Sequence, residues 1–237
     1  MKGVILAGGL GTRLLPMTRI TNKHLLPVYD RPMIYYPLQQ LAYAGIEDVL
    51  IVTGGGSAGD FLRLLRNGRE FGLRDLRYAY QEEEGGIAQA LGLARHFAAG
   101  EPLAVVLGDN IFQHPIRSAV EAFREKPDGA MVLLKQVPDP ERFGVARMED
   151  DRIVEIIEKP SVPSGKLAVT GCYFYDPSVF DIISGLEPSK RGELEITDVN
   201  RVFLESKQLR VERLGRGFAW FDTGTHDSLV DASAYIQ

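Results

Sequence analysis

The sequence predicts an α/β fold in which a mixed, mostly parallel central sheet is flanked by helices. Four short apolar runs lie at residues 4–7, 49–52, 103–107 and 131–134. Because these runs lack an alternation of apolar and polar residues, they are typical of strands buried on both faces. Helical patterns separate the runs, and this β-α-β-α order favours an open sheet with right-handed crossovers. A glycine-rich segment follows the first run, at the strand end where such sheets bind ligands.

Helices are predicted between the strands and near the end of the chain. Pro32 suits the first turn of a helix over residues 33–44, although Pro37 leaves its start open. The other predicted helices span residues 87–98, 116–124 and 227–235. These segments supply the layers that cover the sheet.

The second half of the chain has a different texture from about Phe143 onward. Shorter strands are predicted at residues 144–148, 153–158 and 167–175, with proline and glycine residues between the last two. We expect this half to add antiparallel strands around a ligand. No internal repeat or low-complexity linker separates the halves, so residues 1–237 are predicted to form a single domain with parts at about 1–142 and 143–237.

Composition and charge narrow the functional classes. The 237 residues are 45% hydrophobic and 25% charged, which allows a large core. The formal net charge of -5 argues against a general affinity for nucleic acid. Any bound phosphate therefore needs a local cluster of basic groups.

Cysteine and histidine usage points to the cytoplasm. The lone Cys172 cannot form an intramolecular disulfide, and the four histidines are too scattered for a Cys/His metal site. The apolar run after Lys2 is too short for a signal peptide, and no other run reaches the length that spans a membrane. We therefore expect a soluble protein with no membrane partner.

The chain reads Gly8-Gly9-Leu10-Gly11-Thr12-Arg13 directly after the first predicted strand. Glycines permit positive φ angles and bring backbone N–H groups close to a phosphate. The loop lacks the Gly-Lys-Ser/Thr ending of a P-loop, and Leu14 stands where a dinucleotide fingerprint has its third glycine. The glycines alone also fit a tight turn that binds nothing. Arg13 and Lys23 favour the phosphate site, because together they can neutralise a triphosphate and its pyrophosphate product.

Two aspartates are candidates for a metal site. Asp109 lies two residues beyond the predicted strand at 103–107, and Asp222 follows a short strand-like segment at 219–221. Mg²⁺ prefers oxygen ligands, usually one or two carboxylates together with substrate phosphates and water. For each aspartate the alternative is a turn or helix-cap role, which the Thr-Gly-Thr after Asp222 also suits.

Longer motifs resemble the signature of glucose-1-phosphate thymidylyltransferases, within the sugar-phosphate nucleotidylyltransferase family. The motifs are GGLGTRL at 8–14, LLPV at 25–28, PMIYYP at 32–37, GIAQA at 86–90, LGDN at 107–110, EKP at 158–160, GCYFYD at 171–176, GELEITD at 192–198 and WFDTGT at 220–225. The resemblance implies a single-domain, Rossmann-like nucleotidyltransferase fold. In that fold the first part binds the nucleotide and a small antiparallel part binds the sugar phosphate.

The resemblance also implies a reaction. The chain would join glucose 1-phosphate to the nucleoside monophosphate part of dTTP, giving dTDP-glucose and pyrophosphate with the help of Mg²⁺. The sugar-phosphate oxygen would attack the α-phosphorus in line, and because it is already anionic no general base is needed. Catalysis would then consist of positioning and charge stabilisation.

Roles for individual residues follow from the same resemblance. Catalytic roles fall to Arg13, Lys23 and Lys159, and Mg²⁺ binding to Asp109 and Asp222. The implied nucleotide site comprises Leu6, Gly8, Gly9, Gly11, Thr12, Arg13, Gln81, Gly86, Ile87 and Asp109. The implied sugar-phosphate site comprises Asn110, Gly144, Glu158, Lys159, Val169 and Tyr173.

The base-binding loop departs from the family pattern. Where the family commonly has Gln-Pro and then Pro or Asp before the glycine, this chain reads Gln81-Glu82-Glu83-Glu84-Gly85. We expect the three glutamates to face solvent, because turned inward they would repel phosphate. Without the resemblance, Gln81 and the Glu158–Lys159 pair would be interpreted as surface residues. Glu193 and Asp198 receive no chemical role.

Three alternatives stay open at this point. The same reaction with UTP or another sugar 1-phosphate differs only in pocket details. A catalytically idle regulator that binds nucleotide sugars has little need of both metal carboxylates. A nicotinamide-dependent oxidoreductase is disfavoured by the missing third glycine and by Thr53-Gly54-Gly55-Gly56, where an acidic residue would end the second strand.

Our expectations about regulation and about assembly rest on the resemblance alone. The chain resembles the short form of the family, which argues against a separate allosteric nucleotide site. Because family members form tetramers, we expect a homo-oligomer.

Overall fold

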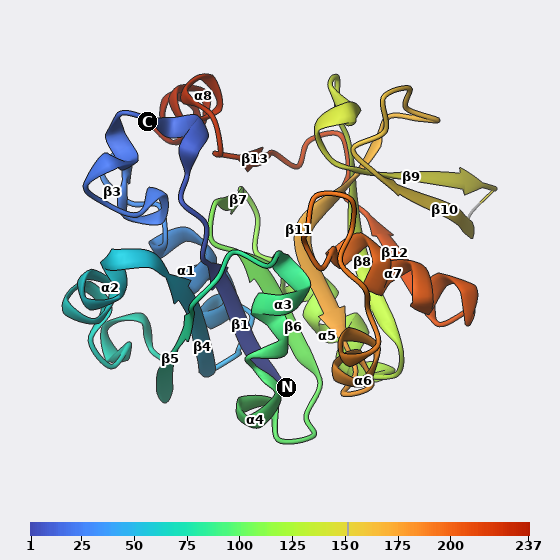
Figure 1. The fold of residues 1–237 in the computed structure, drawn as a ribbon, viewed down its shortest axis with the longest axis horizontal. Coiled ribbons are helices and arrows are strands. Elements are labelled where there is room, and N and C mark those ends of the chain that lie inside the picture. The colour runs from blue at the N-terminus through green and yellow to red at the C-terminus, as the bar shows by residue number, and fades with distance from the viewer. Residues whose placement is uncertain (151) are drawn as a thin grey trace.

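A nine-stranded sheet forms the centre of the protein, and helices cover both of its faces (Figure 1). The structure is a computed structural model that describes residues 1–150 and 152–237. Four of its strands form one parallel block, namely β1 (Lys2–Ala7), β4 (Asp48–Gly54), β5 (Asp75–Gln81) and β6 (Leu103–Leu107). The other strands are β8 (Ala130–Gln136), β9 (Gly144–Glu149), β10 (Arg152–Glu158), β11 (Leu167–Tyr175) and β12 (Leu209–Arg213). The order β10-β9-β11-β6-β1-β4-β5, with β8 beside β11 and β12 beside β8, confirms the predicted mixed α/β sheet.

Both faces of the parallel strands are buried, which explains why their sequences lack alternation. Along β1, Val4 and Leu6 belong to one apolar core, whereas Ile5 and Ala7 belong to the other. The first core is covered by α3 (Ile87–Gly92), α4 (Arg95–Ala98), α6 (Val179–Ser184) and α7 (Ile196–Glu205). The second core is covered by α1 (Tyr35–Tyr43), α2 (Ala58–Leu65) and α5 (Arg117–Glu125).

The sheet forks along β11. Strand β8 occupies one edge of β11, but two strands share the other edge: β6 pairs with its end near Tyr175, and β9 pairs with Leu167 and Ala168. The register against β8 shifts between Val169 and Tyr173, which marks a bulge at the fork. The predicted antiparallel strands therefore extend the same sheet, and Figure 1 shows the β9–β10 hairpin turned away from β1 and β4.

Two small sheets and a terminal helix complete the fold. Strand β2 (Pro27–Val28) pairs with β3 (Arg31–Pro32), and β7 (Asn110–Phe112) pairs with β13 (Trp220–Asp222). A third apolar cluster joins Leu14 to Leu229 of α8 (His226–Ile236). The last helix thereby packs beside the loop that follows β1.

Some predicted elements need correction. The single helix predicted at 87–98 is wrong, because α3 and α4 are separated by a turn in which Leu93 and Ala94 donate hydrogen bonds to carbonyls three residues back. Asp222 is the last residue of β13 and does not follow it. Helices α2, α6 and α7 are absent from the prediction. For α2 the reason is the glycines at 54–56 and 59, which are typical of a loop.

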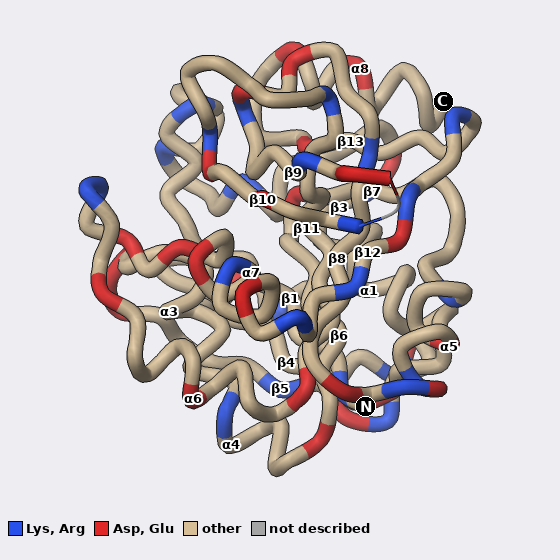
Figure 2. Tube along the Cα trace, turned by 90° about the vertical axis from the view of Figure 1, so that its right-hand side faces the viewer, with Lys and Arg blue, Asp and Glu red and all other residues tan. Residues whose placement is uncertain are grey.

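Acidic and basic residues are interspersed along the trace in the view of Figure 2. This distribution agrees with the modest formal net charge of -5. Among the helices in the described part of the chain, none has the length and apolar character needed to cross a bilayer.

Gln40 on α1 ties the segment that carries β7 to the rest of the fold. The side chain is buried, its amide donates to the Phe112 carbonyl at 2.8 Å, and its oxygen accepts from the Ile116 backbone N–H at 3.2 Å. Both backbone groups lose their partner without this amide.

Gln40→Leu should therefore lower the free energy of unfolding by about 2–4 kcal/mol, since two buried polar groups are left unpaired. Urea denaturation measures the change, and Gln39→Leu on the same helix is the control, expected to shift it by no more than about 0.5 kcal/mol. Equal effects of the two substitutions would contradict this role.

Candidate active site

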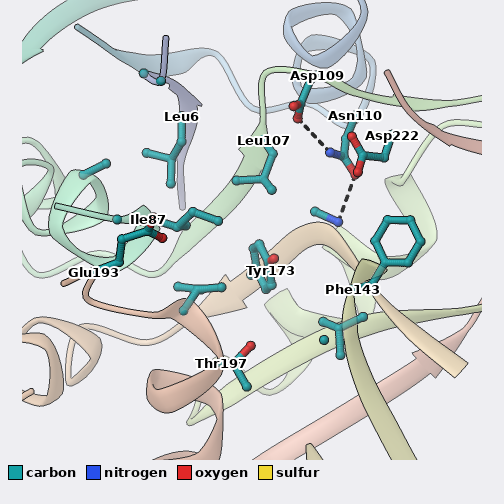
Figure 3. A pocket seen from close by; sticks show the side chains of 18 of the residues that line it. Leu6, Ile87, Leu107, Asp109, Asn110, Phe143, Tyr173, Glu193, Thr197 and Asp222 are labelled. Atoms are coloured by element: carbon teal, nitrogen blue, oxygen red, sulfur yellow. Dashed lines mark hydrogen bonds between the residues drawn. The ribbon is translucent and has the colours of Figure 1, made fainter. Parts of the chain in front are cut away.

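A cavity of about 310 Å³ lies at the carboxyl ends of β1, β5 and β6, beside the fork in the sheet. In Figure 3, Asp109, Asn110 and Asp222 gather at one end of the cavity, Ile87 and Glu193 lie toward another, and Tyr173 stands between them. Of the predicted site residues, the cavity is lined by Leu6, Gly8, Gly9, Arg13, Lys23, Gln81, Gly86, Ile87, Asp109, Asn110, Gly144, Glu158, Lys159, Val169, Tyr173 and Asp222. Gly11 and Thr12 do not line it.

The glycine loop presents unused backbone donors. Gly9 and Gly11 have φ angles of 89° and 62°, which glycine adopts without a steric penalty. Within residues 1–150 and 152–237, the N–H groups of Gly9, Leu10 and Gly11 have no hydrogen-bond acceptor. Gly11 does not line the cavity, and its carbonyl accepts from the Thr18 hydroxyl at 2.8 Å.

Arg13 extends from this loop toward the end of β13. A methyl group at Gly224 would lie 2.8 Å from Arg13 Nη2, so the guanidinium rests against the turn that follows Asp222. Gly224 N–H in turn donates to Asp222 Oδ1 at 3.1 Å. The loop after β1 and the strand β13 therefore supply neighbouring parts of one site.

Asp109 is held by two partners. Lys23 Nζ lies 2.5 Å from Asp109 Oδ2, and Asn110 Nδ2 donates to Asp109 Oδ1 at 3.0 Å. Burial opposes ionisation of this carboxyl, but the Lys23 charge and the hydrogen bonds from Lys23 and Asn110 act together against it and hold the pKa of Asp109 below its usual range. Asp109 is therefore ionised at neutral pH.

His24, next to Lys23, is buried and lines the same cavity. Its Nδ1 lies 2.7 Å from Asn22 Oδ1, so Nδ1 carries the proton. Burial, reinforced by the Lys23 charge, lowers the pKa of His24 to about 3. The ring is therefore neutral at neutral pH.

Asp222 faces Asp109 across the small β7–β13 sheet. Asp222 pairs with Asn110 in register, and Thr223 fixes the Asp109 backbone by donating to its carbonyl from N at 3.0 Å and from Oγ1 at 2.8 Å. Burial and the nearby Asp109 charge raise the pKa of Asp222. One buried and one partly exposed carboxylate that repel each other form a place where a divalent cation would reduce the repulsion.

The donor set fits a hard cation that keeps other ligands. In the part of the chain that the structure describes, no group of three or more Asp, Glu, His or Cys side chains is close enough to hold a metal. Two carboxylates with substrate phosphates and water match the coordination that Mg²⁺ prefers in proteins. Asp109 and Asp222 therefore fit a metal that is bound together with a phosphate ligand.

The opposite wall of the cavity carries Glu158. Its Oε2 accepts from the Thr197 hydroxyl at 2.5 Å, and its Oε1 lies 3.6 Å from Lys159 Nζ and 3.7 Å from Arg191 Nη2. Lys159 has a φ of 41°, an uncommon backbone conformation for a residue with a side chain, and such strain often occurs at functional sites. A carboxylate acceptor thus lies beside two basic side chains at this wall, of which Arg191 is also hydrogen-bonded to Glu195.

Sequence reasoning missed several cavity residues. They include His24, Arg142, Phe143, Ile196, Thr197, Asn200 and Trp220. Thr197 and Trp220 lie in motifs that carry the family resemblance, and that location was the available signal. Trp220 Nε1 donates to Asn110 Oδ1 at 2.6 Å. Glu82 and Glu83 are exposed, as expected, whereas the exposed Glu84 also borders the cavity.

Comparison with known proteins places the chain among nucleotidyl transferases. The Nucleotidyl transferase family model matches residues 2–237. Glucose-1-phosphate thymidylyltransferases from Neisseria meningitidis and Xanthomonas campestris are each 48% identical, and the matches cover 100% of this chain and 83% and 80% of those proteins.

Solved structures agree with the sequence relatives. A Bacillus anthracis structure assigned to glucose-1-phosphate thymidylyltransferase has a TM-score of 0.94 and 49% identity, covering 99% of this chain and 94% of its own. A UDP-glucose pyrophosphorylase complexed with UDP-glucose has a TM-score of 0.87 and 26% identity, covering 99% and 97%. The fold thus occurs in a protein whose solved structure contains a nucleoside diphosphate sugar.

The ion pair between Lys23 and Asp109 should be measurable in the absence of metal. Lys23→Met, Asp109→Asn and the double substitution form a cycle in EDTA, and the expected coupling is about 2 kcal/mol because both groups are largely buried. Urea denaturation gives the four free energies of unfolding. The exposed pair Arg63–Asp60 is the control, with an expected coupling below about 1 kcal/mol; additive effects of Lys23→Met and Asp109→Asn would contradict the assignment.

Proposed function

This chain belongs to the nucleotidyl transferase family, and we propose that it transfers the nucleoside monophosphate group of dTTP to glucose 1-phosphate. The products are dTDP-glucose and pyrophosphate. The observation that carries the proposal is a single cavity in which two facing carboxylates lie between a loop of unused N–H donors and the Glu158–Lys159 wall. The relatives at 44–48% identity are glucose-1-phosphate thymidylyltransferases.

The nucleotide binds along the ends of β1 and β5. Backbone N–H groups of the loop at Gly8 to Thr12 contact the triphosphate, and Arg13 and Lys23 neutralise its charge. Leu6, Gln81, Gly86 and Ile87 surround the base. Gly11 and Thr12 lie outside the cavity lining, so they contribute through the shape and backbone of the loop.

Asp109 and Asp222 would hold Mg²⁺. When bound, the ion neutralises negative charge on the reacting phosphates. Lys23 already pairs with Asp109, so its ammonium is positioned beside the same phosphates. The neutral His24 supplies packing beside Lys23 and adds no further positive charge.

The sugar phosphate binds against the second half of the chain. Glu158, oriented by Thr197, accepts hydrogen bonds from sugar hydroxyls, and Lys159 contacts the sugar phosphate. Gly144, Val169 and Tyr173 shape this pocket. Asn110 has one amide hydrogen left for the sugar, because its oxygen accepts from Gly171 N and Trp220 Nε1 and its other hydrogen goes to Asp109.

The reaction is an in-line substitution at the α-phosphorus. The anionic oxygen of the sugar phosphate forms the new P–O bond while the bond to the bridging oxygen of pyrophosphate breaks, and the leaving electron pair stays on pyrophosphate. No proton has to be removed from the nucleophile. Arg13 and Lys23 stabilise the charge that develops on the leaving group.

A second candidate is the same reaction with UTP. It is favoured by the likeness to the UDP-glucose pyrophosphorylase, which shares the fold at 26% identity. The relatives at 44–48% identity favour dTTP.

We also propose a cytoplasmic homo-oligomer in which residues 1–142 and 143–237 form the nucleotide and sugar-phosphate parts.

The substrate assignment is tested by pyrophosphate release with Mg²⁺, pairing dTTP, UTP, GTP, CTP and ATP with several sugar 1-phosphates. We expect the highest kcat/KM for dTTP with glucose 1-phosphate. A maximum with UTP would move the assignment to the second candidate, and no release with any pair would support a regulator that only binds nucleotide sugars.

Arg13 should matter for the chemical step. Arg13→Ala is expected to lower kcat by about a hundredfold or more, as removal of a charge-stabilising group does in other enzymes. Arg19→Ala is the matched control, since Arg19 is exposed and does not line the cavity. Steady-state kinetics at saturating substrates measures both variants, and an unchanged kcat for Arg13→Ala would exclude this role.

A further inference from the structure

Gln89 on α3 lies behind the base-reading residue and has no part in the function described so far. Its side chain does not line the cavity. Gln89 Oε1 instead accepts two hydrogen bonds, from the backbone N–H of Gly85 at 3.1 Å and from Gln81 Nε2 at 2.7 Å. A second polar shell thus supports Gln81.

These bonds fix the orientation of both amides. The Gly85 N–H donates to the Glu83 carbonyl at 2.9 Å and also points at the Gln89 side chain, so the atom of Gln89 that faces this N–H has to be the oxygen. That oxygen then requires a donor from Gln81, so Nε2 and not Oε1 of Gln81 faces Gln89. The Gly86 carbonyl, 3.4 Å from Gln81 Nε2, is an acceptor and favours the same orientation.

The remaining atom of the Gln81 amide, Oε1, faces the glycine loop. A methyl group at Gly8 would lie 2.6 Å from Gln81 Oε1, and both Gly8 and Gln81 line the cavity. In residues 1–150 and 152–237, no group donates a hydrogen bond to this oxygen. The cavity therefore presents a carbonyl acceptor where a base would bind.

We propose that Gln89 is a positioning residue that locks Gln81 as an acceptor and thereby selects bases with a ring N–H. Thymine and uracil have an N–H at N3, whereas cytosine has an acceptor there, so the locked carbonyl accepts a hydrogen bond from the first two and repels the third. This selection rests on the proposed use of a pyrimidine nucleotide. It explains discrimination against cytosine and does not separate dTTP from UTP.

Gln89 contacts both the Gly85 backbone and the Gln81 side chain, and these two contacts have different consequences. The Gly85–Gly86 segment has its own anchors, because Leu194 N–H donates to the Gly85 carbonyl at 2.7 Å and Ala88 N–H donates to the Leu194 carbonyl at 3.1 Å. Loss of Gln89 therefore leaves the loop attached to the segment before α7. What it removes is the acceptor that keeps Gln81 from turning over.

Two variants separate the roles. Gln89→Leu removes the acceptor and lets the Gln81 amide turn its N–H toward the base, whereas Gln89→Glu keeps an oxygen acceptor facing Gln81 and Gly85. We expect Gln89→Leu to lower the ratio of kcat/KM for dTTP to that for dCTP by about tenfold or more, and Gln89→Glu to keep the ratio within about threefold of the unsubstituted protein. Gln136→Leu, at an exposed glutamine outside the cavity, should not change it.

A binding measurement makes the test independent of turnover. Calorimetric titration with dTDP and dCDP should show the same loss of preference in Gln89→Leu and its retention in Gln89→Glu, with folding checked by thermal melting. If Gln89→Leu does not fold, Gln89→Met gives the same loss of acceptor with a flexible side chain. If the unsubstituted protein binds dTDP over dCDP but turns over neither triphosphate, the proposed reaction fails while this inference stands.

Two results would overturn the proposal. In the first, Gln89→Leu weakens both nucleotides equally and leaves the ratio unchanged, which means that Gln89 only supports the loop. In the second, Gln89→Glu loses the preference as fully as Gln89→Leu, which means that an acceptor at this position does not set the orientation of Gln81.

Discussion

The side chain of Asn110 connects the elements on which the site depends. Its oxygen accepts from Gly171 N–H in the bulge of β11 and from Trp220 Nε1 on β13, while its amide donates to Asp109. A single buried amide therefore spans the fork in the sheet and orients the proposed metal carboxylate. The two halves of the chain meet in one cavity because Asn110 forms hydrogen bonds with Asp109 from the first half and with Gly171 and Trp220 from the second.

The charges around Asn110 explain how the cavity is prepared for phosphates. The buried Asp109 and the partly exposed Asp222 lie near each other, and within residues 1–150 and 152–237 only Lys23 forms an ion pair with Asp109. In the proposed function a cation and phosphates complete this arrangement, so the charges that stabilise them would be in place before the substrates arrive. Glu158, held by Thr197 on the far wall, would give the proposed sugar ligand a fixed acceptor in the same way.

Local sequence patterns predicted most of the sheet, because Val4 and Ile5 belong to a run of consecutive apolar residues, and such a run is visible in the sequence without knowledge of distant contacts. The position of loops directly after strands also led to the prediction of Arg13 and Asp109, and both line the cavity. The fork in β11 depends on pairing with β6 and β9, which are distant in sequence. The contact between Gln81 and Gln89 depends on how the loop between β5 and α3 folds back. No local pattern contains either. Helix α2 escaped prediction because its glycine-rich start resembles a loop, and the tertiary packing of Phe61 overrides that tendency.

The central claim is direct transfer between two bound phosphates, and the stereochemistry at the α-phosphorus tests it most directly. The measurement uses dTTP with one sulfur in a defined configuration at the α-phosphate and determines the configuration of the thio-dTDP-glucose by ³¹P NMR. A single in-line displacement predicts inversion. Retention would indicate two displacements through a nucleotide bound covalently to the protein, with the buried His24 as the first candidate nucleophile, and would contradict the account.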